Sequence, residues 1–224
     1  MKILNQSDLI QLQSSLGETV ANLIKKNIWM QEYKLGERLL EKDQAEKFNV
    51  SRSTIREAFT ILENQGLIVN KARKGTYVAH YTEQDLKELI ELRILIEKNA
   101  VVKALPLLTE IEFTTLSNIL EVMKNQIESA DWYELFNLDL EFHNTIVRAC
   151  GNTRIIKIFE LNQIEMRTYL GYLKESYSNP IDLYTEHLNL FRALQTKDLA
   201  KVTQAIEDHI MYAEEKLLDN LTEK

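Results

Sequence analysis

The residues of this chain best suited to chemistry are one carboxylate and three imidazoles. The chain has only four histidines in 224 residues, and three of them fall on predicted helix faces that should be buried. Asp139 and His143 stand four residues apart beside the apolar stripe of one predicted helix, so both side chains project to one side. His187 and His209 continue the apolar stripes of two further predicted helices.

Burying these four groups without partners would be costly. A shared divalent cation removes that cost, because neutral imidazoles and a carboxylate are good ligands for Zn²⁺, Ni²⁺, Mn²⁺ or Fe²⁺. We therefore predict a metal site made of Asp139, His143, His187 and His209, with Zn²⁺ as the expected ion. The alternative is three separate core histidines, each hydrogen-bonded to its own neighbour.

A buried guanidinium is predicted at Arg93, which continues Leu86 and Leu89 toward the interior of the same helical region. Such a cation needs an anion. A small carboxylate ligand could supply one through two parallel hydrogen bonds. Glu97, one helical turn further on, could instead form a salt bridge with Arg93, and the sequence leaves both interpretations open.

A second group of candidate residues, in the first 80 positions, is basic. Arg52 and Arg56 lie one turn apart near the start of a predicted helix, opposite its apolar stripe. Arginine can bind the O6 and N7 atoms of guanine with two hydrogen bonds. Two arginines on a helix could equally be no more than a solvated face.

The surroundings of these two arginines favour DNA binding. Hydroxyl groups at Ser51, Ser53 and Thr54 can donate to phosphates at the helix start. Further candidates are Arg38, before a short predicted helix, and a hairpin tip formed by Arg73, Lys74 and Gly75. Gly75 also permits a close backbone approach to a phosphate or the minor groove.

The elements that position the basic group have a characteristic order. Apolar spacing predicts a helix over 7–28, a short helix ending at Asn49, a third helix capped by Ser51, and two short strands at 67–69 and 76–79. This order is typical of a winged helix-turn-helix, whose third helix enters the major groove of DNA.

Beyond residue 80 the sequence shows only long helical periods. Six helices are expected, over residues 82–105, 109–128, 131–149, 153–176, 180–195 and 198–219. The predicted fold is therefore mainly α, with a winged helix-turn-helix and a small β-hairpin over 1–80. An all-α bundle follows over 81–224.

Charge and composition agree with two parts of different function. Residues 1–80 carry 12 Lys and Arg against 9 Asp and Glu, a net charge of +3, whereas residues 81–224 carry a net charge of −10. The single cysteine, Cys150, cannot form an intramolecular disulfide, and the first residues lack the apolar core of a signal peptide. We expect a cytoplasmic protein without a membrane span.

The first part resembles the DNA-binding domain of GntR-type bacterial transcription regulators. The resemblance covers about residues 10–80 and rests on the stretch GERLLEKDQAEKFNVSRSTIREAFTILENQGLIVNKARKGTYV. Leu35 and Thr54 depart from the family pattern, since proline is common at both places. The resemblance puts seven residues at DNA-contacting positions: Arg38, Ser51, Arg52, Ser53, Thr54, Arg56 and Gly75.

The second part resembles FCD, the all-helical ligand-binding domain of the FadR-like branch of these regulators. The segments LRILIE, DLEFHNTIVRACGN, EHLNLFRAL and AIEDHI carry this resemblance over about residues 82–215. Six helices are similar to the VanR-type subgroup. The resemblance implies that the Asp and three His are metal ligands, that Arg93 lies near the effector, and that Asn162 and Arg167 are further candidates for the pocket lining.

Together these expectations predict a homodimeric, metabolite-responsive transcription regulator. The two basic N-terminal domains of the dimer, its heads, would bind paired half-sites of double-stranded operator DNA, because the symmetry of the protein is mirrored in the DNA. A small organic acid held beside the metal would change operator affinity, provided that it prefers one arrangement of the heads. The alternatives are a metal-dependent hydrolase and a regulator that senses the metal itself.

Overall fold

The computed structural model describes residues 15–173 and 179–222. The chain divides into two compact units, Met1–His80 and Tyr81–Lys224. Residues 7–14 of the first predicted helix and residues 174–176 of the fourth bundle helix lie outside the described residues. None of the described helices is long and apolar enough to cross a membrane.

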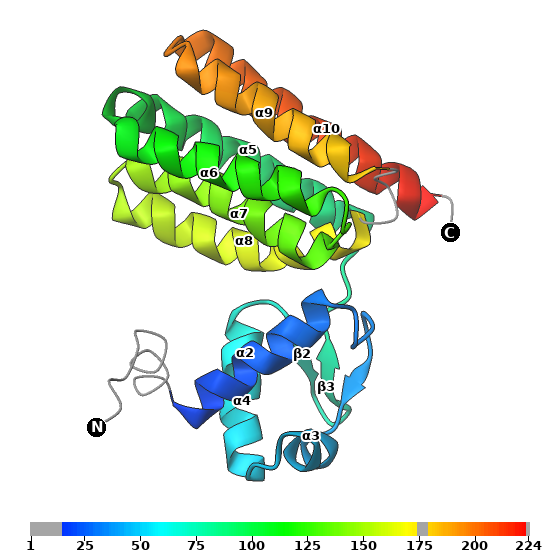
Figure 1. Ribbon diagram of the computed structural model, residues 1–224. Coiled ribbons are helices and arrows are strands. Elements are labelled where there is room, and N and C mark those ends of the chain that lie inside the picture. The colour runs from blue at the N-terminus through cyan, green and yellow to red at the C-terminus, as the bar shows by residue number, and fades with distance from the viewer. Residues whose placement is uncertain (1–14, 174–178, 223–224) are drawn as a thin grey trace, which may run out of the picture. The chain divides into compact units, whose positions relative to one another are not determined.

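Over residues 15–80, the described part of the first unit, three helices combine with a three-stranded antiparallel sheet (Figure 1). The helices are α2 (Leu16–Trp29), α3 (Glu41–Phe48) and α4 (Arg52–Asn64), and the strands are β1 (Arg38–Leu39), β2 (Ile68–Lys71) and β3 (Gly75–Val78). The sheet order is β1-β3-β2. This is the predicted winged helix-turn-helix with its β-hairpin.

Local sequence signals explain where the helices of the first unit begin and end. The side chain of Ser51 accepts a hydrogen bond from the backbone N–H of Thr54, which caps α4 as expected. Asn49 ends α3 in the left-handed region, with φ of 53°. Strand β1 was not predicted, because two residues are too short for a recognisable period. Leu39 lies buried in this strand, ahead of the short helix.

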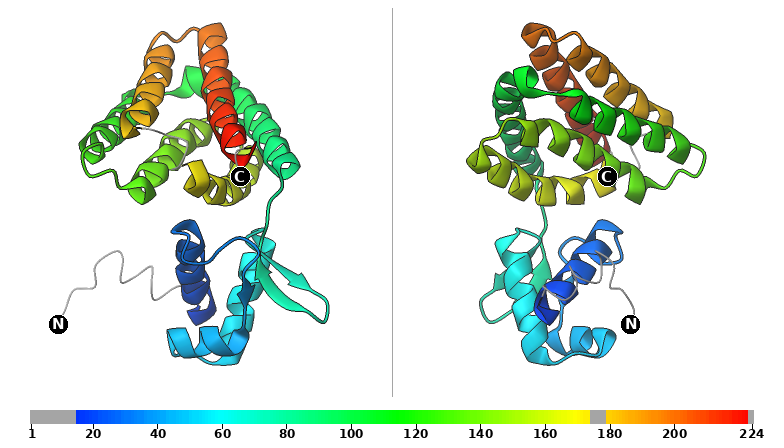
Figure 2. Two further views of the ribbon diagram at one scale, coloured as in Figure 1. Left: turned by 90° about the vertical axis from the view of Figure 1, so that its right-hand side faces the viewer. Right: turned by 60° about the vertical axis from the view of Figure 1, so that its left-hand side comes forward.

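The second unit is a bundle of six α-helices in the described part of the chain. They are α5 (Glu83–Ala104), α6 (Glu110–Gln126), α7 (Trp132–Ala149), α8 (Thr153–Leu173), α9 (Pro180–Gln195) and α10 (Leu199–Thr222), with a 3-10 turn at Leu105–Leu107. Helix α7 contacts α5, α6, α8 and α9, so it occupies the middle of the bundle. Figure 2 shows α10, in red, beside α5, in green.

Capping side chains hold the helix starts of the bundle. Thr82 and Asp85 form a reciprocal capping box at the start of α5, in which the Thr82 N–H donates to Asp85 Oδ2 at 2.7 Å and the Asp85 N–H donates to Thr82 Oγ1 at 3.1 Å. Thr109 and Glu112 repeat this arrangement at α6. The start of α5 therefore depends on one hydroxyl and one carboxylate.

Replacing Thr82 with Ala should destabilise the second unit by about 1 kcal/mol, the usual cost of losing an N-cap side chain. Urea unfolding in a Trp29→Phe background measures this, because Trp132 is then the only tryptophan. Thr114→Ala is the matched control, since Thr114 is an exposed residue inside α6 whose hydroxyl donates to Glu110 O. Equal midpoints for the two variants would contradict the capping role.

Candidate metal centre and DNA-reading surface

Four potential ligands from three helices meet inside the second unit. Asp139 and His143 come from α7, His187 from α9 and His209 from α10. One ligand atom of each residue lies within 4.8 Å of those of the other three. All four residues are buried. The structure therefore brings together the four residues that the sequence singled out, rather than scattering the histidines through the core.

Helical periodicity explains why these side chains reach one point. The i,i+4 spacing puts Asp139 and His143 on one face of α7, next to the buried Phe142. His187 follows Leu183 by one turn of α9 and lies on its buried face. His209 follows the buried Ile206 on α10. Because α9 and α10 pack against each other, their two imidazoles lie side by side, with ring centroids 4.6 Å apart.

Two of the three imidazoles are oriented by a hydrogen bond from Nδ1. The His143 Nδ1–H donates to Glu97 Oε2 at 2.7 Å, since a carboxylate can only accept. The His187 Nδ1–H donates to the Leu183 carbonyl at 2.8 Å. His209 Nδ1 lies 3.5 Å from Glu186 Oε2. Partners of this kind fix the tautomer of metal-ligating histidines and leave Nε2 with its lone pair free to bind an ion.

The Nε2 atoms lie close to other potential ligand atoms. His143 Nε2 and His209 Nε2 are hydrogen-bonded at 2.9 Å, and which of the two donates depends on the tautomer of each ring. His187 Nε2 lies 3.1 Å from Asp139 Oδ1 without forming a hydrogen bond among the described residues. His187 Nε2 and the Asp139 carboxylate offer electron pairs that a cation shared by the four groups would satisfy.

Burial favours the neutral forms of His143 and His209, which are the forms that bind a metal ion. Burial lowers the pKa of His143 despite the opposing attraction of Glu97. Burial, with repulsion from His187 and His143, lowers the pKa of His209 well below its usual value. At Asp139 burial acts to raise the pKa, but the neighbouring His187 and Arg93 outweigh it, so the pKa lies below the usual range and the carboxylate is ionised.

Unsatisfied buried atoms also fit a metal ion. Asp139 Oδ2 and His187 Nε2 have no hydrogen-bond partner among the described residues. An isolated polar atom in a protein interior costs free energy, and native structures rarely leave one without a function. Three imidazoles and one carboxylate form a suitable donor set for Zn²⁺ and for other divalent transition metals.

Arg93 is paired with Glu97. Its Nε donates to Glu97 Oε1 at 2.6 Å, and both side chains are buried. Of the two partners considered from the sequence, the structure shows the glutamate. Glu97 also accepts from His143, so it joins the guanidinium to a metal-ligand candidate. At Glu97 burial acts to raise the pKa, but His143 and Arg93 outweigh it and lower the pKa. Sequence reasoning missed this second role.

The two remaining effector candidates lie on α8. Arg167 is fully buried, and it donates from Nε to Asn137 Oδ1 at 3.2 Å and from Nη2 to the Tyr133 carbonyl at 3.0 Å. Its guanidinium also lies over the Tyr133 ring. Burial lowers the pKa of Arg167 to about 10. Asn162 donates from Nδ2 to the Leu89 carbonyl at 3.3 Å, so both residues tie α8 to neighbouring helices.

The start of α4 presents the predicted DNA-contacting residues on one face. Arg52 and Ser53 are exposed, and the Ser51 hydroxyl lies 2.7 Å from that of Ser53 and 2.9 Å from that of Thr54. The opposite face of α4 is buried through Ile55, Ala58, Phe59 and Leu62, as the sequence predicted. The arrangement suits the insertion of a helix N-terminus into the major groove.

Arg56 has an additional partner. Its Nε donates to both oxygens of Glu41, at 3.0 and 2.9 Å, and the arginine side chain is exposed. The pair links α4 to α3. Any contact of Arg56 with a base would therefore compete with Glu41, which sequence reasoning did not single out.

Arg38 and Gly75 lie against each other at the wing. Strand β1 pairs with β3, which brings Arg38 opposite Tyr77. Gly75 has a φ of 103°, and a Cβ atom there would lie 3.2 Å from Nε and Nη2 of Arg38. The wing therefore needs glycine for its backbone and for the guanidinium beside it. Arg73 and Lys74 are exposed at the tip of the hairpin.

Comparisons with known proteins agree with this architecture. Residues 16–78 match the family of bacterial regulatory proteins called the gntR family, and residues 88–211 match the FCD domain. The gluconate operon transcriptional repressor of Bacillus subtilis is 30% identical over 92% of this chain and 87% of its own length. The HTH-type transcriptional repressor RspR of Escherichia coli is 28% identical over 81% of this chain and 80% of its own length.

A solved structure also has this fold. The structure of E. coli McbR/YncC superposes with a TM-score of 0.80 at 24% sequence identity, covering 93% of this chain and 100% of that chain. The chain belongs to the gntR family of bacterial regulatory proteins and carries an FCD domain. It is a DNA-binding transcription regulator and not an enzyme, because its relatives are regulators. The hydrolase alternative is therefore abandoned.

Removing the carboxylate of Glu97 should weaken metal binding, because His143 loses the partner that orients its ring. We expect Glu97→Ala to lower Zn²⁺ affinity about tenfold to a hundredfold, the usual effect of losing such a partner. Competition with a chromophoric chelator measures it. Glu97→Gln, which keeps an acceptor, should lose less. The control is Glu160→Ala, which removes only an exposed ion pair with Arg148. If Glu97→Ala bound Zn²⁺ as tightly as this control, Glu97 would have no role in orienting His143.

Proposed function

We propose that this regulator is a metabolite-responsive repressor whose second unit binds a divalent metal ion and a small carboxylate effector. The observation that carries the proposal is the convergence of Asp139, His143, His187 and His209 within 4.8 Å, all of them buried. A buried cluster of four potential ligands, in which Asp139 Oδ2 and His187 Nε2 have no hydrogen-bond partner among the described residues, has no evident use in holding the fold alone. It has a direct use in binding an ion.

The metal would be held by Nε2 of His143, His187 and His209 and by a carboxylate oxygen of Asp139. Zn²⁺ is the expected ion, and Ni²⁺, Mn²⁺ and Fe²⁺ suit the same donors. Once bound, the ion supplies a concentrated positive charge to which an anionic ligand can bind. Glu97 and the Leu183 carbonyl keep two of the rings oriented before the ion arrives.

The effector would be a small organic acid. Arg93 and Arg167 are buried guanidinium groups of this unit, and guanidinium groups bind carboxylates through paired hydrogen bonds. An effector carboxylate at Arg93 would share it with Glu97, which already accepts from its Nε. Asn162 is a further candidate for the lining, because it is buried on α8 and its Oδ1 has no hydrogen-bond partner among the described residues.

The first unit would read operator DNA through α4 and the wing. Arg52 is the best candidate for a base contact, since it is exposed at the start of α4. The hydroxyl groups of Ser51, Ser53 and Thr54 suit phosphate contacts. Arg38, Arg56, Arg73, Lys74 and Gly75 complete the proposed surface. We place the protein in the cytoplasm, where the operator is.

The regulator would act as a homodimer on a palindromic operator, because a two-fold protein matches paired half-sites. Repression is proposed from its relatives, since the gluconate operon protein and RspR are both named as repressors. An effector changes operator affinity only if it binds more tightly to one arrangement of the two DNA-binding domains than to the other. The size of the change is limited by this difference in effector affinity.

The DNA-reading part of the proposal separates base contacts from phosphate contacts. Arg52→Ala should weaken operator binding by about 1–3 kcal/mol and relax the preference at one base pair. Lys74→Ala should weaken binding to all sequences alike. Binding titrations against the operator and its single-base variants test both. An equal loss at every sequence for Arg52→Ala would refute base reading by Arg52.

The sensing part is tested by titrating the metal and a panel of small carboxylic acids separately. With Zn²⁺-loaded protein, one acid should raise the melting temperature and shift operator affinity, whereas Zn²⁺ alone should change operator affinity little. His187→Ala should abolish both effects of the acid while DNA binding persists. A full change in operator affinity on adding Zn²⁺ alone would instead identify the metal as the signal.

A further inference from the structure

One of the four candidate metal ligands lies closer to solvent than the others. His143 and His187 are 0% exposed and Asp139 is 2% exposed, whereas His209 is 7% exposed. An ion that reaches this cluster has to pass through or beside the side chains that cover it. This difference indicates that the layer of protein between the cluster and solvent is thinnest on the α10 side, where His209 is located.

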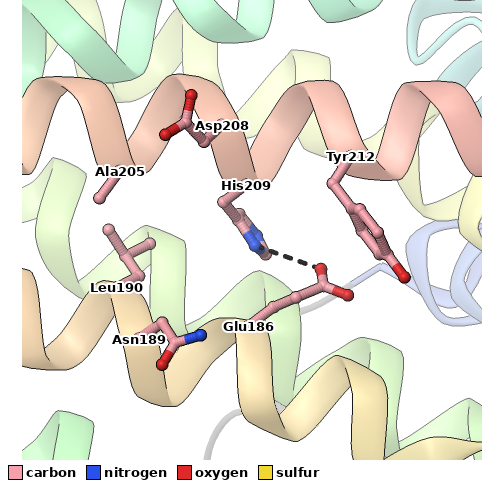
Figure 3. A pocket seen from close by; sticks show the side chains of 7 residues that line it. All are labelled: Glu186, Asn189, Leu190, Ala205, Asp208, His209 and Tyr212. Atoms are coloured by element: carbon pink, nitrogen blue, oxygen red, sulfur yellow. Dashed lines mark ion pairs between the residues drawn. The ribbon is translucent and has the colours of Figure 1, made fainter.

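A cavity of about 310 Å³ lies on that side, between α9 and α10 (Figure 3). His209 is the only one of the four ligands among its described lining residues. Ala205 of α10 and Asn189 of α9 also line it. A second cavity, along α5, is lined by Leu95, Lys98 and their neighbours and includes none of the four ligands.

The lining of the α9–α10 cavity carries negative charge. Glu186 and Asp208 contribute carboxylates, and the described lining residues include no lysine or arginine. Figure 3 shows Glu186 reaching across from α9 toward the His209 ring, and its Oε2 lies 3.5 Å from His209 Nδ1. Carboxylates in a cleft raise the local concentration of cations, so this cavity would attract a divalent ion and offer it a path to His209.

We propose that the α9–α10 cavity is the path by which a divalent cation reaches and leaves the metal centre, with His209 as the first ligand it meets. The inference rests on the proposed metal centre and adds its route of exchange. It gives Glu186 and Asp208 a function in metal uptake, and it makes Ala205, with the smallest side chain of these residues, a place where the path can be closed.

Ala205→Leu should narrow the cavity without altering any ligand. Because loading and release use the same path, a narrowed path raises the activation free energies of Zn²⁺ loading and of Zn²⁺ release by the same amount. We expect stopped-flow Zn²⁺ loading of the metal-free full chain, and Zn²⁺ release to an excess of chelator, to slow by one common factor of about ten, equivalent to about 1.4 kcal/mol. The dissociation constant should stay unchanged. The control is Ala200→Leu, on an exposed position of α10 outside the lining.

Asp208→Asn is the second variant, since it removes charge without adding bulk and changes an exposed residue. It should slow loading most at low salt and weaken the salt dependence of the loading rate. This result keeps the proposal testable if Ala205→Leu fails to fold.

The outcomes distinguish the route from the site. The proposed path would be overturned if Ala205→Leu loaded and released Zn²⁺ at the same rates as Ala200→Leu. It would also be overturned if Asp208→Asn loaded Zn²⁺ at the wild-type rate at low salt. Faster release with a raised dissociation constant would also overturn it, because the residue would then act on the bound ion. A wild-type chain that binds no Zn²⁺ would instead overturn the metal centre itself.

Discussion

The second unit depends on one electrostatic constraint, which is that four electron-pair donors are buried at one point. His143 Nε2 and His209 Nε2 are 2.9 Å apart, and His187 Nε2 and Asp139 Oδ1 are 3.1 Å apart. His187 Nε2 and Asp139 Oδ2 have no hydrogen-bond partner among the described residues, and a cation shared by the four groups would satisfy them. Burial disfavours the protonated forms of His143 and His209, which suits binding of a metal ion by neutral imidazoles.

The constraint reaches well beyond the four ligands. Glu97 joins α5 to α7 through His143, and the Arg93 guanidinium joins the same carboxylate. Glu186 faces His209 across the contact between α9 and α10. Four helices of the bundle are thus connected through groups whose orientation matters for one ion. Under the proposed function, an ion bound at this point would act on groups from all four helices.

Much of this arrangement could be predicted from residue spacing. The i,i+4 pair on α7 and the apolar stripes of α9 and α10 place the four ligands on buried faces, and the Ser51 cap with the stripe from Ile55 to Leu62 defines α4. The contacts of Glu97 with His143, of Glu186 with His209 and of Arg56 with Glu41 could not be predicted. Each joins residues from different helices, and the packing of those helices, rather than any local pattern, decides which side chains meet. Strand β1 was missed because two residues carry no period.

The most direct test of the central claim is anomalous diffraction at the zinc absorption edge from crystals of the full chain grown with Zn²⁺. We expect one strong anomalous peak per chain inside the second unit, bonded to three Nε2 atoms and to a carboxylate oxygen of Asp139. A chain with the same imidazole positions but no peak among them, or with its zinc bound elsewhere, would contradict the account.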